Sequence, residues 1–168
     1  LSGAYFETYV NDINAVLPTG GDRGAIADLS SKGWEASVGY TWANGFVRAN
    51  YTDADVELNS TTIGSTAYYL GRPVGKAIAL EGAVDVTNEW TFGGTAEIAF
   101  KNRDTPVPLS GYEVANLYAT YTPSSFDRLQ MRLDVRNIFD ATYTSRSSDG
   151  VGLGNVIALT EPGRSVSL

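Results

Sequence analysis

The sequence contains no cysteine and no histidine. Disulfide bonds, thiolate metal sites and any catalytic pairing of serine or cysteine with histidine are therefore excluded within this chain. Its 12 basic side chains are outnumbered by 19 acidic ones, for a net charge of −7. That balance argues against nucleic acid as a partner, because nucleic-acid-binding proteins present a basic patch. We therefore expect neither an enzyme nor a nucleic-acid-binding protein, and we predict no metal or cofactor.

Long apolar runs are missing as well. No stretch approaches the roughly 18–20 apolar residues that a membrane-spanning helix needs, and the mean hydropathy is slightly negative at −0.13. A spanning helix is excluded, whereas a spanning β-barrel is not, because only every second residue of its strands has to be apolar. The chain opens on Leu1-Ser2-Gly3, which is typical of the middle of a strand and not of a signal peptide. We expect further sequence upstream if the protein is exported.

Apolar and polar residues alternate along most of the chain, and helical periodicity is nearly absent. Between residues 34 and 42, for example, Trp34, Val38 and Trp42 fall on one parity, while Glu35 and Ser37 fall on the other. The pattern predicts strands at 4–13, 34–42, 47–52, 78–87, 90–101, 115–121 and 129–136, and a last one that begins near Arg164.

The connections between these strands are unequal in a regular way. Short turns are predicted at 42–46, which contains an Asn-Gly pair, at 87–90 and at 123–128. Long polar loops are predicted at 15–31, 56–76, 102–111 and 141–161. Short turns that alternate with long loops are typical of an outer-membrane barrel, which has its turns in the periplasm and its loops outside.

A soluble β-sandwich also shows alternation, because one face of each sheet is core and the other is solvated. Two features favour the membrane. The predicted strands run to about 9–11 residues, the length that crosses a bilayer at a tilt. Aromatic residues gather near strand ends as in interfacial girdles: Trp42, Trp90 and Tyr121 beside the short turns, and Trp34, Tyr51 and Phe100 towards the loops.

The C-terminal third carries a specific motif. Residues 133–140 read Leu-Asp-Val-Arg-Asn-Ile-Phe-Asp, Tyr143 follows, and Glu161-Pro162-Gly163-Arg164 comes after a loop. This combination resembles the closing signature of TonB-dependent receptors, in which Pro-Gly-Arg opens the last barrel strand. The upstream stretch 111–118 and the strand start at 33–35 are also similar to that family.

The residues of this signature suggest structural roles. Asn137 and Asp140 can bond the turn backbone through their side chains, and Phe139 and Tyr143 can anchor the turn by packing. Pro162 suits the start of a strand because it lacks an N–H group. The remaining two members are Gly163, which permits a bend, and Arg164, which can place a charge in the lumen or at the interface.

The resemblance implies an all-β fold, an antiparallel transmembrane β-barrel segment of meander hairpins. About seven to eight strands would belong to a barrel of about 22 with a plugged lumen. Residues 1–168 would form the C-terminal part of the barrel domain, without the plug and the earlier strands. The family normally continues to a terminal aromatic residue, whereas this chain stops at Leu168.

The resemblance further implies a receptor in the outer membrane of a Gram-negative bacterium, embedded in outer-membrane lipid. Its function would be energy-coupled uptake of an iron chelate, a ferric siderophore or haem, with TonB-ExbB-ExbD acting through the absent plug region. A small outer-membrane barrel with a structural or adhesin role is the alternative.

Loop residues are the candidates for ligand binding. Tyr68, Tyr69 and Arg72 lie in one predicted loop and suit an aromatic or anionic ligand, and Arg146 lies in the last one. The alternative is that they are ordinary loop residues that pack on neighbouring loops.

Six charged residues share the polar parity of their strands and are predicted to face the lumen. There they would either pair with charges of the plug, since an unpaired buried charge is costly, or face water. They are Glu81, Asp85, Glu97, Arg132, Asp134 and Arg136. Three further acids, Asp53, Asp55 and Glu57, alternate at a strand end but lack the glycine and terminal glutamate of a calcium loop, so a solvated acidic rim is predicted there.

Overall fold

The computed structural model describes residues 1–16, 23–63, 72, 74–105, 108–126, 128–146, 149–152 and 155–168. Within these ranges the chain contains strands and connections, and no helix capable of spanning a membrane. The strands are β1 (Ser2–Val16), β2 (Arg23–Trp42), β3 (Gly45–Leu58), β4 (Thr61–Thr62), β5 (Gly75–Asp85), β6 (Trp90–Ala99), β7 (Tyr112–Tyr121), β8 (Met131–Arg136), β9 (Asp149–Gly152), β10 (Asn155–Ala158) and β11 (Ser165–Ser167).

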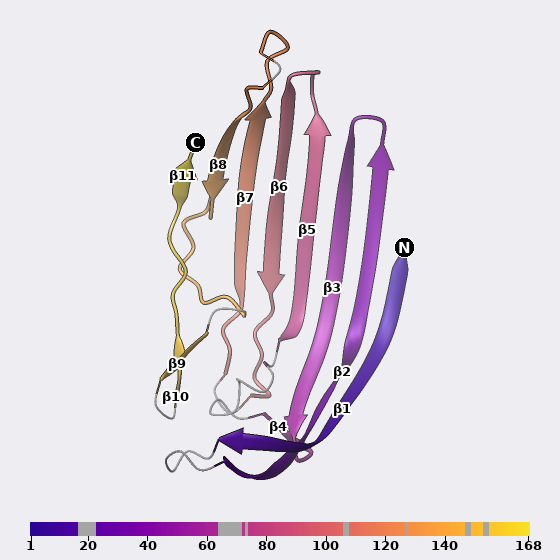
Figure 1. Ribbon diagram of the computed structural model, residues 1–168, viewed down its shortest axis with the longest axis vertical. Helices are drawn as coiled ribbons and strands as arrows, with labels where there is room; N and C mark the ends of the chain where they lie inside the picture. The colour runs from indigo at the N-terminus through magenta and orange to yellow at the C-terminus, as the bar shows by residue number, and fades with distance from the viewer. Residues whose placement is uncertain are drawn as a thin grey trace.

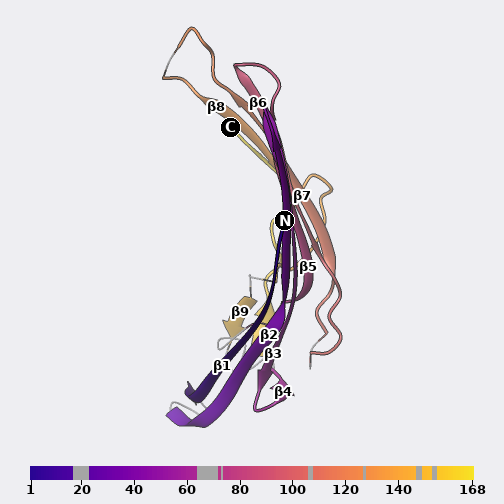
Figure 2. The ribbon, with the colours of Figure 1, turned by 90° about the vertical axis from the view of Figure 1, so that its right-hand side faces the viewer.

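One antiparallel sheet dominates the described structure. Its strands follow the order β1-β2-β3-β5-β6-β7-β8-β11, and β4 pairs with β3 at the side. Strands that follow one another along the chain are neighbours in space, so the predicted all-β meander is confirmed (Figure 1). The sheet is curved, and the β9–β10 hairpin lies on its concave side (Figure 2).

The unequal connections are as predicted in part. At one end of the sheet, β2 and β3 are joined through residues 43–44, β5 and β6 through 86–89, and β7 and β8 through 122–130. At the opposite end, the connections after β6 and β8 are longer, and the one after β8 contains the β9–β10 hairpin (Figure 1).

Two predicted loops are wrong in part. Most of 15–31 belongs to strands, because β1 continues to Val16 and β2 already begins at Arg23; likewise β3 continues to Leu58 and is followed by β4. The ladder between β1 and β2 extends from Ser2 opposite Ser37 to Val16 opposite Arg23, with two register shifts. Backbone pairing therefore continues where side-chain alternation has stopped, and β1, β2 and β3 exceed the predicted strand length.

The register places residues of the same predicted parity, from neighbouring strands, on the same face of the sheet. Val47 lies opposite Gly82, Gly82 opposite Gly94, and Gly94 opposite Leu117. Residues directly opposite one another in a ladder share a face. The apolar residues of neighbouring strands therefore form one continuous surface, and the polar parity forms the other.

Among the described side chains, buried apolar ones are few and gather near the end with the long connections. Val56 and Ile63 form one cluster with Leu29 and Leu58 packed against it. Ala99, Tyr112 and Val114 form a second cluster, with Tyr143 packed against it. Most of the large apolar side chains instead remain exposed on the sheet.

Candidate functional site

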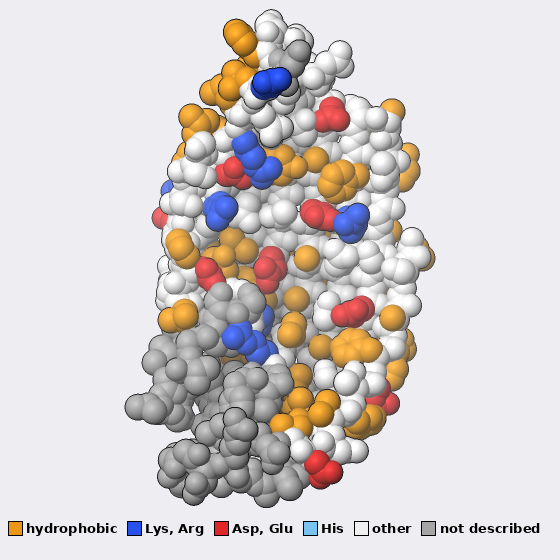
Figure 3. Space-filling view, in the orientation of Figure 1, with side chains coloured by type: hydrophobic (Ala, Val, Ile, Leu, Met, Phe, Trp, Pro, Cys, Tyr) orange, Lys and Arg blue, Asp and Glu red, His pale blue; other side chains and the backbone are white. Residues whose placement is uncertain are grey.

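Charged and polar side chains gather on the concave face of the sheet, the face shown in Figure 3. Arg48 on β3 lies directly opposite Glu81 on β5, and its Nη1 is 2.6 Å from Glu81 Oε1. Asp85 accepts a hydrogen bond of 2.6 Å from the Thr91 hydroxyl. Glu81 and Asp85 are thus engaged by neighbours within the same sheet.

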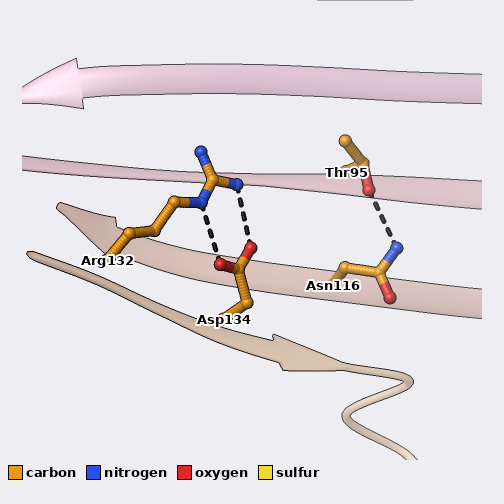
Figure 4. A network of polar contacts seen from close by, with 4 residues as sticks. All are labelled: Thr95, Asn116, Arg132 and Asp134. Carbon is orange, nitrogen blue, oxygen red and sulfur yellow. Dashed lines mark hydrogen bonds and ion pairs between the residues drawn. The ribbon is translucent and has the colours of Figure 1, made fainter. Parts of the chain in front are cut away.

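Arg132 and Asp134 form the best-defined ion pair. Two parallel hydrogen bonds run from Arg132 Nε and Nη2 to the Asp134 carboxylate at 2.9 and 2.8 Å (Figure 4). The guanidinium also stacks over the Tyr118 ring, 3.9 Å from its centroid. Such a bidentate geometry fixes the orientation of both charges.

A pocket of about 520 Å³ opens beside this pair. Strands β6, β7 and β8 supply Thr95, Asn116 and Arg136 to its wall, and the returning segment supplies Tyr143 and Glu161. Asn116 donates a 3.0 Å hydrogen bond to the Thr95 hydroxyl (Figure 4). The pocket contains charges of both signs and a large share of hydrogen-bonding groups, as expected of a surface that meets water or a polar partner.

The predicted signature residues form one cluster where β8 ends and β11 begins. Asn137 is 3% exposed and has a φ of 49°. Its side chain bonds both the N–H and the C=O of Ala141 at 2.8 Å, and it also donates to the Pro162 carbonyl at 3.3 Å. One amide therefore joins two segments that lie 25 residues apart in the chain.

Asp140 completes this cluster from the opposite side. It has a φ of 56°, and its carboxylate accepts the Arg164 N–H at 2.8 Å. A Cβ atom at Gly163 would lie 2.8 Å from Asp140 Oδ1, so a larger residue there would displace this carboxylate. Phe139 differs from the expectation of packing, because it is 72% exposed.

Tyr143 and Arg146 tie the following segment to the sheet. The Tyr143 ring packs at 4.8 Å from that of Tyr112, and the Tyr112 hydroxyl donates to the Glu97 carboxylate. Arg146 donates its N–H to the Tyr112 hydroxyl at 3.1 Å and its Nη2 to the Phe100 carbonyl at 2.7 Å. In this structure Arg146 thus holds a loop against β6 and β7.

Three further residues were predicted as ligand contacts. Tyr68 and Tyr69 lie outside the described residues. Arg72 is half-buried, and its carbonyl accepts the N–H of Val74 at 2.9 Å.

The acids at the end of β3 lie on the convex face of the sheet, opposite the concave face. We call this convex face the outward face. Glu57 pairs with Lys32 at 3.1 Å and Asp53 with Lys76 at 3.5 Å. Asp55 lies opposite Lys32 in the ladder. No group of three or more potential metal ligands occurs among the described side chains.

Two residues of the concave face were not among the predicted site residues. Arg48 neutralises Glu81, and Tyr118 supports Arg132. Both fall on the polar parity, so the alternation places them on this face. What the alternation cannot provide is the pairing across strands, which follows from the register.

The outward face carries an exposed apolar band. Val38 is 51% exposed and Leu117 52%, which is unusual in water because soluble monomers rarely expose large continuous apolar patches. Where side chains are described on β2 to β8, the exposed large ones of this parity are Trp34, Val38, Tyr40, Trp42, Val47, Leu80, Trp90, Phe92, Leu117, Met131 and Leu133.

Aromatic rings border this band at both ends. Near the short turns, Trp90 stacks on Tyr121 with ring centroids 4.6 Å apart; towards the long connections, Trp34 contacts Tyr5 at 5.0 Å. Trp34 and Trp42 are eight positions apart on β2, so at about 3.3 Å per residue they are separated by about 26 Å along the strand. Counted inclusively, the segment from Trp34 to Trp42 has the length of about 9–11 residues with which a tilted strand crosses a bilayer.

Known structures share this arrangement. No protein-family model matches the sequence, and neither does any curated protein. Among solved structures, the FrpB iron transporter of Neisseria meningitidis matches 98% of this chain with a TM-score of 0.73 at 17% identity. The copper transporter OprC matches 98% with a TM-score of 0.72 at 16% identity, and the ferripyoverdine receptor of the Pseudomonas aeruginosa outer membrane matches 98% with 0.66 at 20%.

The chain has the barrel fold of TonB-dependent receptors. It spans about a quarter of the length of these structures, 23% to 27% of each. The walls of such barrels have an apolar face towards lipid and an inner face towards the lumen, and the two faces of this sheet show a similar contrast.

Proposed function

We propose that this chain forms the C-terminal wall of a TonB-dependent receptor that imports an iron chelate across the outer membrane of a Gram-negative bacterium. The observation that carries the proposal is the pairing of two unlike faces on one curved sheet. The outward face is an apolar band between aromatic girdles, and the concave face is a polar, ion-paired surface. The C-terminal position is supported by the cluster around Asn137, Asp140 and Gly163.

An iron chelate is favoured as the cargo class. FrpB is described as an iron transporter, the Pseudomonas protein as a ferripyoverdine receptor, and Fiu of E. coli K12 as a ferric-catecholate import receptor. OprC is described as a copper transporter, so the metal itself needs testing. Within iron chelates, the proposal includes both ferric siderophores and haem.

Growth under iron limitation tests the cargo. Strains with and without the gene are supplied with one iron source at a time: haem, a ferric catecholate or a ferric hydroxamate. We expect the deletion strain to fail on one of these sources and to grow normally on ferrous salt. A deletion that leaves growth on every iron source unchanged but alters copper accumulation would overturn the iron assignment.

We also propose that the concave face meets the plug of the intact receptor, and that energy reaches the plug through TonB-ExbB-ExbD. Arg136 supports this because it stands in the wall of the pocket and is exposed. Reversing Arg132 and Arg136 to glutamate would loosen the plug and admit bulky antibiotics, as measured by susceptibility. Normal resistance in a strain with normal receptor levels would contradict this role.

The extracellular loops are the proposed ligand contacts, with Tyr68, Tyr69, Arg72 and Arg146 as candidates. Replacing Tyr68 and Tyr69 with alanine should weaken binding of the chelate that supports growth. Because Arg146 bonds the Phe100 carbonyl, Arg146→Ala should change the loop position as well. Lysine at position 146 separates the two effects, since it retains the charge without the forked geometry.

A further inference from the structure

The connection between β7 and β8 differs from the other tight turns at its end of the sheet. It comprises residues 122–130, whereas β2 and β3 are joined by two residues. Backbone hydrogen bonds order it: the Phe126 N–H donates to the Pro123 carbonyl at 3.1 Å and the Leu129 N–H to the Phe126 carbonyl at 3.0 Å. Figure 1 shows that it projects beyond the neighbouring turns.

Two large apolar side chains of this connection are exposed. Phe126 is 64% exposed and Leu129 44%. An exposed phenylalanine and leucine on an ordered turn indicate a surface that meets an apolar partner.

The position of Leu129 identifies that partner. Met131 lies opposite Tyr121, and Tyr121 opposite Trp90, in the ladders of the outward face. Leu129 precedes Met131 by two residues, so the apolar alternation of β8 extends in the sequence one step beyond the aromatic girdle. The exposed apolar residues of the turn thus follow directly on the apolar parity of the outward face.

We propose that Phe126 and Leu129 form an anchor that inserts into the phospholipid interface on the turn side of the membrane. The inference rests on the proposed membrane location of the sheet. Aromatic and aliphatic side chains next to a basic residue are typical of interfacial segments, because the rings enter the acyl boundary while the charge stays at the headgroups. Arg128 is exposed between the two, and the adjacent Asp127 means that apolar contact, not net charge, drives insertion.

Site-specific labelling tests the anchor, and the absence of cysteine from the chain suits it. In the intact protein, with any cysteine elsewhere replaced by serine, Phe126→Cys is labelled with an environment-sensitive fluorophore. The protein is reconstituted into vesicles of phosphatidylethanolamine and phosphatidylglycerol. Asn88→Cys on the neighbouring turn is the aqueous control, and Leu133→Cys in the apolar band is the lipid control.

We expect the label at position 126 to be quenched by spin-labelled lipid and to resist aqueous iodide several-fold better than the label at position 88. If iodide quenches both turn labels equally, the anchor is wrong. A label at 126 that neither lipid nor iodide reaches indicates a protein partner and also overturns the proposal. If position 133 is not quenched by lipid, the membrane location itself fails, whereas quenching at 133 without quenching at 126 rejects only the anchor.

Discussion

The side-chain amide of Asn137 bonds both backbone groups of Ala141, accepting from its N–H and donating to its C=O, each at 2.8 Å. The pair closes a compact turn directly after β8. Because Asn137 is buried and has a left-handed backbone, its side chain and its conformation both hold this turn in place.

Two substitutions separate these contributions. Asn137→Ala removes the hydrogen bonds and retains a side chain that disfavours the left-handed backbone, so we expect a loss of about 2–4 kcal/mol in unfolding free energy. Asn137→Gly loses the same bonds without the backbone penalty, and we expect it to be more stable than the alanine variant by about 1 kcal/mol. Urea unfolding of the refolded protein in detergent measures both. Equal stability of the two variants would mean that the backbone conformation contributes nothing.

On the concave face, the Tyr118 ring lies between Gly93 and Arg132. Gly93 lies opposite Tyr118, a Cβ atom at Gly93 would lie 2.4 Å from the Tyr118 hydroxyl oxygen, and Arg132 covers the same ring. Gly93→Ala should therefore displace the ring and weaken its contact with Arg132, at a cost of about 1 kcal/mol.

Gly39→Ala is the matched control for this variant. Gly39 lies on the polar parity of β2, but a Cβ atom there would be 3.6 Å from the Val47 carbonyl oxygen, an ordinary contact. We expect the control to be neutral or slightly stabilising, because alanine restricts the unfolded chain. The coupling is checked by adding Arg132→Ala, which should cost less in the Gly93→Ala background than in the native protein.

The alternation of residues was sufficient to predict the faces and neighbours of the central strands. Val47, Leu80 and Leu117 fall on the apolar parity in the sequence, and the ladders place all three on one face. Period-two patterning determines register because a slip of one residue would move every side chain to the opposite face.

The alternation was not sufficient where both faces are polar. The start of β2 carries residues such as Asp28, Ser30 and Ser31, so it was predicted as part of a loop, although backbone pairing continues through it. Nor could spacing predict that Asn137 would reach Pro162, or Arg146 would reach Phe100. These contacts join residues distant in the chain and depend on where the connections cross the sheet.

Lowering the pH should weaken the hydrogen bonds that join the β5–β6 turn to the β7–β8 turn. The Ser124 hydroxyl and N–H both donate to the Glu89 carboxylate, the latter at 2.8 Å, and these bonds hold the pKa of Glu89 below its ordinary value. A depressed pKa stabilises the folded state above the pKa of the unfolded chain, about 4.3 for glutamate, and this stabilisation is lost as pH falls through the folded value.

We therefore expect Glu89→Gln to be less stable than the native protein near neutral pH and to approach it as the solution is acidified below pH ~4. The urea midpoint, followed as a function of pH, measures the difference. Ser124→Ala should show an intermediate dependence, because its backbone N–H remains. A difference between native and glutamine proteins that stays constant with pH would contradict the role of ionised Glu89.

Adjacent residues of β5 test the assignment of the two faces. Leu80 is 39% exposed on the apolar face, whereas Ala79, exposed on the polar face, lies opposite Asn50 and Glu97. In a bilayer, Leu80→Arg should cost about 2–4 kcal/mol because a charge near the midplane must leave water, whereas Ala79→Arg should cost little beside Glu97. Folding of both variants into vesicles, measured by urea titration, makes the comparison. Equal tolerance of arginine at the two positions would mean that Leu80 faces water, and the outward face would no longer qualify as a membrane surface.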